Sequence, residues 1–433
     1  MQIHVVSAGE TLRSIADYYG VSVNKLIQDN GLNADNDLVT GQSIVIIYPE
    51  LIYTVQEGDT LTGIADTFSV TVMQLYRNNP YLFEREFIYP GDTIVISYEK
   101  EGPITVHGHA APFINTDVLV RTLPYLTYLS ILNYTASAEG EIITYYDDTN
   151  IIRLAREYSV FPLMLLTTLT LQGKPNIGIA FDLLLNDAFQ ESQLENILYI
   201  LRTKGYYGVN LSFQYITVTN IQLYESFLAK IATRLKEEGY FVCVTIDPNI
   251  TVENDEVRFE RVDYSILNQY ADSIIFMNYE WAFNYNSPSP ISSIRNTELF
   301  LNHVLQYIPP EKIVIEISTI GYDWELPYIP GISRVNSLSF DRVTDLALNS
   351  RAVIQFDEVS QTPYFYYEAE NRIDHVVWFI NSRSIRSSLE LFSRYQLQGV
   401  AIWNLSVFNT QLWMIINSRY EIEKNTDSQP SGT

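Results

Sequence analysis

Eight apolar, strand-like runs alternate with amphipathic helical stretches over residues 104–423, and this alternation constrains the fold more than any other feature. In chain order the runs are 104–110, 126–135, 162–169, 208–214, 240–247, 273–280, 312–319 and 399–405. Strands that alternate with helices form parallel sheets, and eight of them favour a closed (β/α)8 TIM barrel of the α/β class. Because site residues in such barrels follow the strands, we expect functional side chains at the ends of these runs.

The first hundred residues contain the same unit twice. Gly9 recurs as Gly58 and Thr11 recurs as Thr60, so the two copies are offset by 49 residues. Each copy reads strand, helix, helix, strand, and each closes with a glycine and a β-rich run, GQSIVII or GDTIVIS. The threonines are suited to cap the first helix of each copy. The repeat therefore predicts two small α+β (βααβ) modules, at 2–48 and 52–98, joined to the barrel by a short polar linker, EKEGP.

The repeated motifs GETLRSIA and GDTLTGIA, each followed by an Asn and a closing Gly before IVI, resemble the LysM family. That resemblance implies binding of N-acetylglucosamine glycans such as peptidoglycan and chitin. The ligand would lie in a groove between the start of the first helix and the loop before the last strand. By the resemblance, the grooves would be bordered by Gly9, Thr11, Gly58, Asp59 and Thr60. For any single one of these residues, capping a helix or turning the chain is the simpler interpretation; for the whole repeat it is not.

The net charge and the composition restrict the kinds of molecule that this protein is expected to bind. A net charge of −24 argues against nucleic acid and against anionic membranes, because both attract basic proteins. No apolar run reaches 18 residues and the N-terminus lacks a secretory signal pattern, so neither membrane insertion nor export by a signal peptide is expected.

The one cysteine, Cys243, lies in an apolar run and is expected to be a buried thiol. His107 and His109 share a strand face without a third ligand at useful spacing, so no metal or other cofactor is predicted. Nothing in the sequence indicates an oligomeric state.

The ends of five predicted strands carry LSFQYI, TIDPN, MNYEWAF, STIGYDWELPY and AIWNLS. Together they resemble glycoside hydrolase family 18, and within it the spore cortex-lytic N-acetylglucosaminidases, which join two LysM modules to a TIM barrel without a secretion signal. The specific matches are Met277–Trp281, Gly321–Tyr328, His375–Phe379 and Gly399–Trp403. The resemblance covers nearly the whole chain: it assigns 104–423 to the barrel, leaves 424–433 as a polar tail, and implies a spore-envelope location after cytoplasmic synthesis.

The resemblance also exposes a gap in the chemistry. In the family, strand four reads Asp-Gly-x-Asp-x-Asp-x-Glu. The Glu is the general acid, the Asp two residues before it orients the substrate acetamide, and the acetamide oxygen is the nucleophile. In this chain the four carboxylate positions are occupied by Tyr207, Asn210, Ser212 and Gln214. A glutamine amide donates hydrogen bonds without releasing a proton, and general acid catalysis contributes roughly 10²–10⁴ in rate. Turnover is therefore expected near background.

Other positions of the family pattern are retained. Tyr279 matches the tyrosine that bonds the acetamide, Trp403 matches the tryptophan beneath the sugar, and Glu280 stands for the neighbouring Asp. The resemblance extends the predicted substrate-binding set by Trp281, Tyr322, Trp324 and Asp247.

Three interpretations follow. The one we favour is a non-catalytic glycan-binding protein whose barrel keeps an aromatic cleft, with Gln214 hydrogen-bonding a bound sugar. The second is a working N-acetylglucosaminidase with a relocated acid, Asp247 or Glu280. The third is a structural spore-coat protein whose barrel is a scaffold. A cleft filled by side chains such as Tyr207 or Phe283, rather than open over Trp403, would argue against the first.

Overall fold

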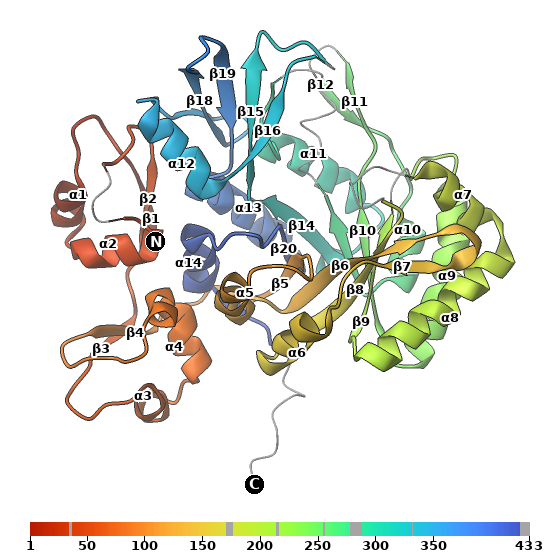
Figure 1. Cartoon of the computed structure of the whole chain (residues 1–433), viewed down its shortest axis with the longest axis horizontal. Helices are drawn as coiled ribbons and strands as arrows, with labels where there is room; N and C mark the ends of the chain where they lie inside the picture. Colours follow the sequence, from red (N-terminus) through yellow and green to blue (C-terminus); the bar gives the residue numbers. More distant parts are fainter. Residues whose placement is uncertain are drawn as a thin grey trace.

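The computed structural model describes residues 1–33, 37–169, 176–213, 216–253, 256–277, 288–330 and 332–424. Its centre is a closed barrel of eight parallel strands (Figure 1). The strands are β5 (Gly102–Ala110), β6 (Tyr128–Ala136), β8 (Phe161–Thr167), β9 (Gly208–Phe213), β10 (Phe241–Ile246), β13 (Ser273–Phe276), β14 (Ile313–Ser318) and β20 (Gly399–Trp403). Pairing of β5 with both β6 and β20 closes the ring. All eight predicted strands are thereby confirmed.

Helices cover the outside of the barrel. They are α5 (Thr116–Thr122), α6 (Thr149–Glu157), α7 (Ile177–Leu185), α8 (Asp187–Lys204), α9 (Ile221–Glu237), α10 (Ser265–Tyr270), α11 (Ile294–Val304), α13 (Ser382–Tyr395) and α14 (Thr410–Arg419). Helix α9 shows why they pack there: Tyr224, Leu228 and Ile231 recur at helical spacing and are all buried. Within the described residues, no helix combines the length and apolar character needed to cross a membrane.

Inside the barrel, five of the strands contribute small and medium apolar side chains to one central cluster. They are Leu163, Cys243, Ile275, Val314 and Ala401. Cys243 is fully buried, as predicted, and burial raises the pKa of its thiol. Because side chains alternate across a strand, this cluster identifies which residues of these five strands face the interior, and strand pairing extends the assignment to their neighbours.

A five-stranded antiparallel sheet is inserted between β14 and α13, and the sequence patterns did not separate it from the barrel. In spatial order its strands are β16 (Val335–Ser339), β15 (Ile320–Leu326), β19 (Asp374–Trp378), β18 (Thr362–Glu368) and β17 (Gln355–Asp357). Helix α12 (Phe340–Asn349) packs against it. In its middle, Asp323 accepts hydrogen bonds from Tyr367 Oη (3.0 Å) and His375 Nδ1 (2.8 Å).

Each N-terminal module has the predicted strand, helix, helix, strand order. The first contains β1 (Gln2–Val5), α1 (Leu12–Tyr19), α2 (Val23–Asn30) and β2 (Ser43–Ile46); the second contains β3 (Leu51–Thr54), α3 (Leu61–Phe68), α4 (Val72–Asn78) and β4 (Thr93–Ser97). Both predicted caps form. Thr11 Oγ1 accepts from Ser14 N at 3.1 Å and Thr60 Oγ1 accepts from Gly63 N at 3.0 Å. Each module also has a small apolar core of its own.

Both modules are docked against the barrel beside α14 (Figure 1). Two buried amides of α14 make the contact: Gln411 Nε2 donates to Asn30 Oδ1 at 2.9 Å, and Asn417 Nδ2 donates to Asn78 Oδ1 at 2.8 Å. The segment expected to be a linker is also held, since Lys100 Nζ donates to the carbonyl of Asn417. Glu101 likewise pairs with Arg419 of α14, so this connecting segment lies against the barrel.

The predicted tail begins one residue too early. Strand β21 (Tyr420–Ile422) pairs with β5, and Lys424 Nζ then donates to the carbonyl oxygens of Leu123 (2.8 Å) and Leu126 (2.7 Å). Lys424 therefore belongs to the folded domain. Residues 425–433 lie outside the described part of the chain.

Candidate functional site

Strand β9 brings its polar face into the barrel, as predicted. Gly208 pairs with the interior residue Leu163, and Asn210 pairs with the interior residue Cys243. Ser212 follows on the same face, one layer nearer the carboxyl-terminal mouth of the barrel. Asn210 and Ser212 thus face the barrel interior, as strand alternation predicts for two of the pattern's positions.

Asn210 is fixed by two hydroxyl groups from neighbouring strands. Its Nδ2 donates to Ser130 Oγ on β6 at 3.0 Å, and its Oδ1 accepts from Thr245 Oγ1 on β10 at 2.8 Å. The side chain is 0% exposed. An amide suits this position because it offers one donor and one acceptor, which a carboxylate does not. The network is neutral and connects three parts of the barrel wall.

Ser212 lies partly exposed at the end of β9. It lines a cavity of about 30 Å³ together with apolar side chains of β8, α7 and α9. A space of that size holds water and not a sugar ring. Gln214, the residue at the family's acid position, lies outside the described residues, as do Tyr279, Glu280 and Trp281. Their predicted roles stay predictions.

Trp403 ends β20 at the barrel mouth, beside Ser318 on β14. Its ring lies 5.4 Å from that of His109, centroid to centroid. Burial lowers the pKa of His109 to about 4, so this imidazole is neutral at pH 7. Trp403 is partly exposed and is supported from below by a neutral ring, which suits a platform for an uncharged ligand.

The structure reveals an interior carboxylate that the sequence analysis missed. Glu316 on β14 pairs with Ala401, which in turn pairs with His107 on β5, and Glu316 is 1% exposed. Burial lowers the pKa of His107 to about 3. The signal was present in the run KIVIEIST, where isoleucines alternate with Val314, Glu316 and Ser318. It was overlooked because only strand-end residues were considered.

Asp247 comes directly after β10. Its backbone N–H donates to the carbonyl of Phe213 at 3.4 Å, which puts it next to the end of β9. This is the mouth of the barrel, where a ligand-contacting carboxylate was expected. Its side chain is partly exposed.

Tyr322 and Trp324 lie on β15, in the inserted sheet, and both are buried. Trp324 is 1% exposed and meets Tyr328 edge to face at 4.9 Å between ring centroids. A ring buried in this way packs in the core and presents no face to a sugar. A role of either residue in ligand contact stays a prediction that would require its side chain to become exposed.

Tyr207 lies at the amino-terminal end of the barrel, opposite the end that carries Trp403. It precedes β9, is 38% exposed, and packs against Phe161 at 4.0 Å between ring centroids. Tyr128 and Phe241 complete this aromatic cluster. Phe283, the other residue considered, lies outside the described residues.

The second N-terminal module has a pocket of about 250 Å³ where the LysM resemblance puts the groove. Its lining includes Asp59 and Thr60 at the start of α3, with Arg85 and Phe87 from the loop before β4. Asp59 Oδ2 accepts from Tyr53 Oη at 2.8 Å and from Gln56 N at 2.7 Å, so this carboxylate also orders the turn.

The two glycines of the repeat shape these turns. Gly9 has φ +85° and Gly58 has φ +89°, a conformation that L side chains rarely adopt, and a Cβ added at either position would meet nothing within 4 Å. The backbone angle, rather than lack of space, therefore requires glycine here. Thr11, in the first module, closes a capping box with Ser14.

Known protein families match both the barrel and the two N-terminal modules. Residues 167–407 match the family described as Glycosyl hydrolases family 18, and residues 4–46 and 53–97 each match the LysM domain. The chain therefore belongs to glycosyl hydrolases family 18 and carries two LysM domains. These domains imply binding of glycans that contain N-acetylglucosamine, such as peptidoglycan.

Relatives similar over their whole length give more detail. The chain is 31% identical to the cortical fragment-lytic enzyme of Bacillus subtilis (strain 168), over 98% of this chain and 100% of that protein. It is 30% identical to the cortical fragment-lytic enzyme of Bacillus anthracis, over 98% and 99%. Among solved structures, the spore cortex-lytic enzyme SleL of Bacillus cereus superposes with a TM-score of 0.80 at 26% identity, covering 98% of this chain and 99% of that one.

Proposed function

We propose that this protein binds peptidoglycan-type glycans at the spore cortex or coat through its LysM modules and its barrel mouth, without hydrolysing them. The observation that carries the proposal is the neutral interior face of β9, where Asn210 is locked between Ser130 and Thr245 and Gln214 follows in the sequence. Location at the spore is inferred from relatives named as cortical fragment-lytic and spore cortex-lytic enzymes.

Two titratable residues of the described barrel interior, His109 and Glu316, are poorly suited to replace the missing general acid, which supports this proposal. Burial lowers the pKa of His109 to about 4, so at pH 7 it is a neutral imidazole and not the imidazolium that a general acid would need. Glu316 lies one interior position deeper than Ser318 and is 1% exposed, so it is withdrawn from the solvent at the mouth. Trp403 still offers an apolar face on which a sugar ring can stack.

The test uses the purified full chain with N-acetylglucosamine oligomers and cortex peptidoglycan fragments. We expect binding by calorimetry and no cleavage products by mass spectrometry. Trp403→Ala should weaken binding by about tenfold, because it removes the stacking face. Tyr366→Ala, at an exposed tyrosine of the inserted sheet, is the matched control and should bind normally. Cleavage by the parent chain that Trp403→Ala abolishes would refute the proposal. Unchanged binding by Trp403→Ala would instead make the barrel a scaffold.

A working hydrolase is the second candidate, favoured by the position of Asp247 beside the end of β9. A carboxylate there could act as the relocated acid, with Glu280 as the other candidate. The variants Asp247→Asn and Glu280→Gln test whether either carboxylate acts as the relocated acid. If any measured hydrolysis survives both substitutions unchanged, the relocated acid is excluded.

A further inference from the structure

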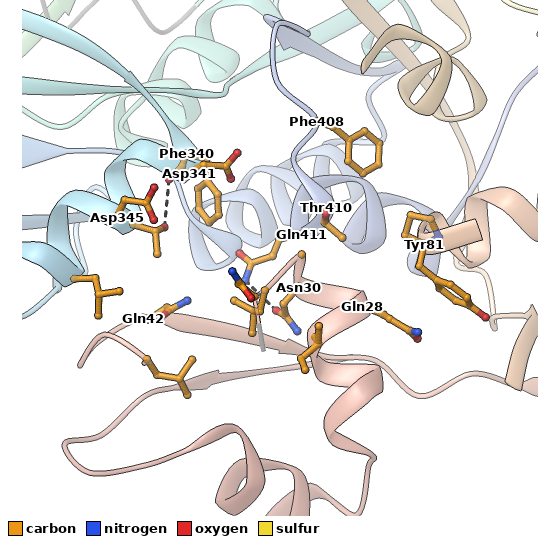
Figure 2. A pocket seen from close by; sticks show the side chains of 18 of the residues that line it. Gln28, Asn30, Gln42, Tyr81, Phe340, Asp341, Asp345, Phe408, Thr410 and Gln411 are labelled. Carbon is orange, nitrogen blue, oxygen red and sulfur yellow. Dashed lines mark hydrogen bonds between the residues drawn. The ribbon is translucent and has the colours of Figure 1, made fainter. Parts of the chain in front are cut away.

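A cavity of about 450 Å³ lies where five parts of the chain meet: the first LysM module, the second LysM module, helix α5, helix α12 of the inserted sheet, and α14 with the loop before it (Figure 2). Its volume is in the range of ligand sites. It shares no residue with the barrel mouth, and none with the pocket of the second module. Neither the LysM grooves nor the chemistry of the barrel assigns it a role.

The walls of this junction cavity are held together without a ligand. A Cβ on Gly31 would lie 2.5 Å from Thr410 Oγ1, so the end of α2 sits directly against the start of α14. Gln411 Nε2 donates to Asn30 Oδ1 and to the carbonyl of Ser43, both at 2.9 Å. The cavity is therefore preformed, and a ligand would not have to assemble it.

Gln411 also gives the cavity an unused acceptor. The residue is 2% exposed, and its Oε1 has no hydrogen-bond partner among the described residues. Figure 2 shows its side chain at the cavity wall, with its amide nitrogen directed to Asn30. Buried polar atoms are nearly always satisfied, so this carbonyl oxygen is open to a donor from water or from a ligand in the cavity.

The charges of the cavity select the ligand. Asp341 and Asp345 lie one turn apart on α12, and both are exposed to the cavity. The cationic side chain in the lining, Arg121, is already engaged: it pairs with Glu84 at 2.8 Å and stacks on Phe408 at 4.3 Å from the ring centroid. The cavity therefore repels anions and attracts a cation that carries several hydrogen-bond donors.

Apolar faces complete the site. Tyr81, Phe340 and Phe408 come from three different parts of the chain and all line the cavity (Figure 2). Carboxylates and the amides of Gln28 and Gln42 lie in the same lining. A sugar ring has an apolar CH face, which stacks on aromatic rings, and hydroxyl groups, which hydrogen-bond to such polar groups.

We propose that this junction cavity binds an amino sugar with a free ammonium group, as in an N-deacetylated stretch of an N-acetylglucosamine glycan. The ammonium lies between Asp341 and Asp345, and a sugar hydroxyl donates to Gln411 Oε1. The proposal extends the proposed function to a third site and rests on it only for the class of ligand. It survives if the barrel binds nothing.

The experiment titrates the full chain with a glucosamine oligomer, at a pH where its amines are protonated, and with the N-acetylated oligomer of equal length. The double variant Asp341→Asn, Asp345→Asn should weaken binding of the glucosamine oligomer by about tenfold or more, the loss expected for one charge-assisted hydrogen bond. Its binding of the acetylated oligomer should not change. Both carboxylates are exposed, so the variant should fold, which its melting curve checks.

A matched control removes the same charge elsewhere on the inserted sheet: Glu370→Gln with Asp374→Asn, two exposed residues that do not line the cavity. An unchanged affinity of the cavity variant, or an equal loss in the control, overturns the proposal, because either result makes the attraction non-specific. Trp403→Ala distinguishes the sites. If Trp403→Ala weakens binding of the acetylated oligomer only, that binding occurs at the barrel. If Trp403→Ala also weakens binding of the glucosamine oligomer, the result counts against the junction cavity as its site.

Discussion

Gln411 and Asn30 lie 381 residues apart in the chain, and a 2.9 Å hydrogen bond between their buried amides joins the barrel to the first LysM module. Asn30 Oδ1 also accepts from Val45 N at 2.7 Å, so the same oxygen orders the module's own last strand. The docking contact and the internal fold of the module are thereby coupled through one side chain.

Gln411→Leu should loosen this contact. It keeps the volume but removes both donors, leaving the carbonyl of Ser43 buried without that partner, at a cost of about 1–3 kcal/mol. We expect faster hydrogen exchange in β2 with little change in the barrel strands. Asn417→Leu is the comparison variant, since it should release the second module instead. Equal exchange in β2 of the parent and Gln411→Leu would contradict the coupling.

Gly41→Ala should be more damaging than Gly9→Ala, although the two backbone angles are nearly equal, φ +86° and φ +85°. At Gly9 a Cβ meets open space, so only the backbone strain of about 1 kcal/mol applies. At Gly41 a Cβ would lie 1.9 Å from the carbonyl oxygen of Ile354 in the inserted sheet's domain. Urea unfolding of both variants measures the difference. Equal losses would show that the module does not rest on Ile354.

His107→Phe should make stability less sensitive to acid. Burial lowers the pKa of His107 from 6.5 to about 3, so below pH 6.5 the unfolded chain binds a proton that the folded chain does not. The free energy of unfolding therefore falls as the pH drops through this window. Phenylalanine keeps the stacking on Tyr128, 4.5 Å away, and removes the titration. The variant should lose about 2 kcal/mol less than the parent between pH 7 and pH 5. An unchanged pH dependence in urea titrations would refute the assignment.

Restoring two carboxylates should restore turnover if the barrel mouth holds a sugar in the family's register. Ser212→Asp with Gln214→Glu returns the orienting group and the acid, and the acid alone contributes roughly 10²–10⁴ in rate. Product formation from N-acetylglucosamine oligomers, followed by mass spectrometry, measures the gain. Ser212→Asp alone is the control and should remain inactive. A double variant that binds glycan and still does not cleave it would mean that the sugar lies in a different register.

The barrel and the modules could be predicted from sequence because their signals are local. The alternation in KIVIEIST predicts a strand from eight consecutive residues, and the motif that follows Gly9, repeated after Gly58, predicts a capped helix in each module. The inserted sheet could not be separated, because a single residue, Thr319, lies between the end of β14 and the start of β15, and the second strand reads as a continuation of the first.

The candidate site was predicted only in part, for a related reason. The interior position of Asn210 follows from strand alternation, whereas its partners Ser130 and Thr245 are 80 and 35 residues away and leave no local pattern. Burial of Trp324 depends on how a second sheet packs, which no spacing rule conveys. The junction cavity could not be predicted for the same reason, since its walls come from five distant segments.

The docking of both LysM modules onto α14 also affects how the protein would meet a long glycan. Modules on a free tether search a volume set by tether length, and their gain in avidity falls as the tether grows. Here buried hydrogen bonds hold both modules on α14, so the second-module pocket, the junction cavity and the barrel mouth have fixed separations and directions in the structure. For the glycan binding proposed above, the stiffness and curvature of the glycan strand would then decide which of these sites one strand can occupy together.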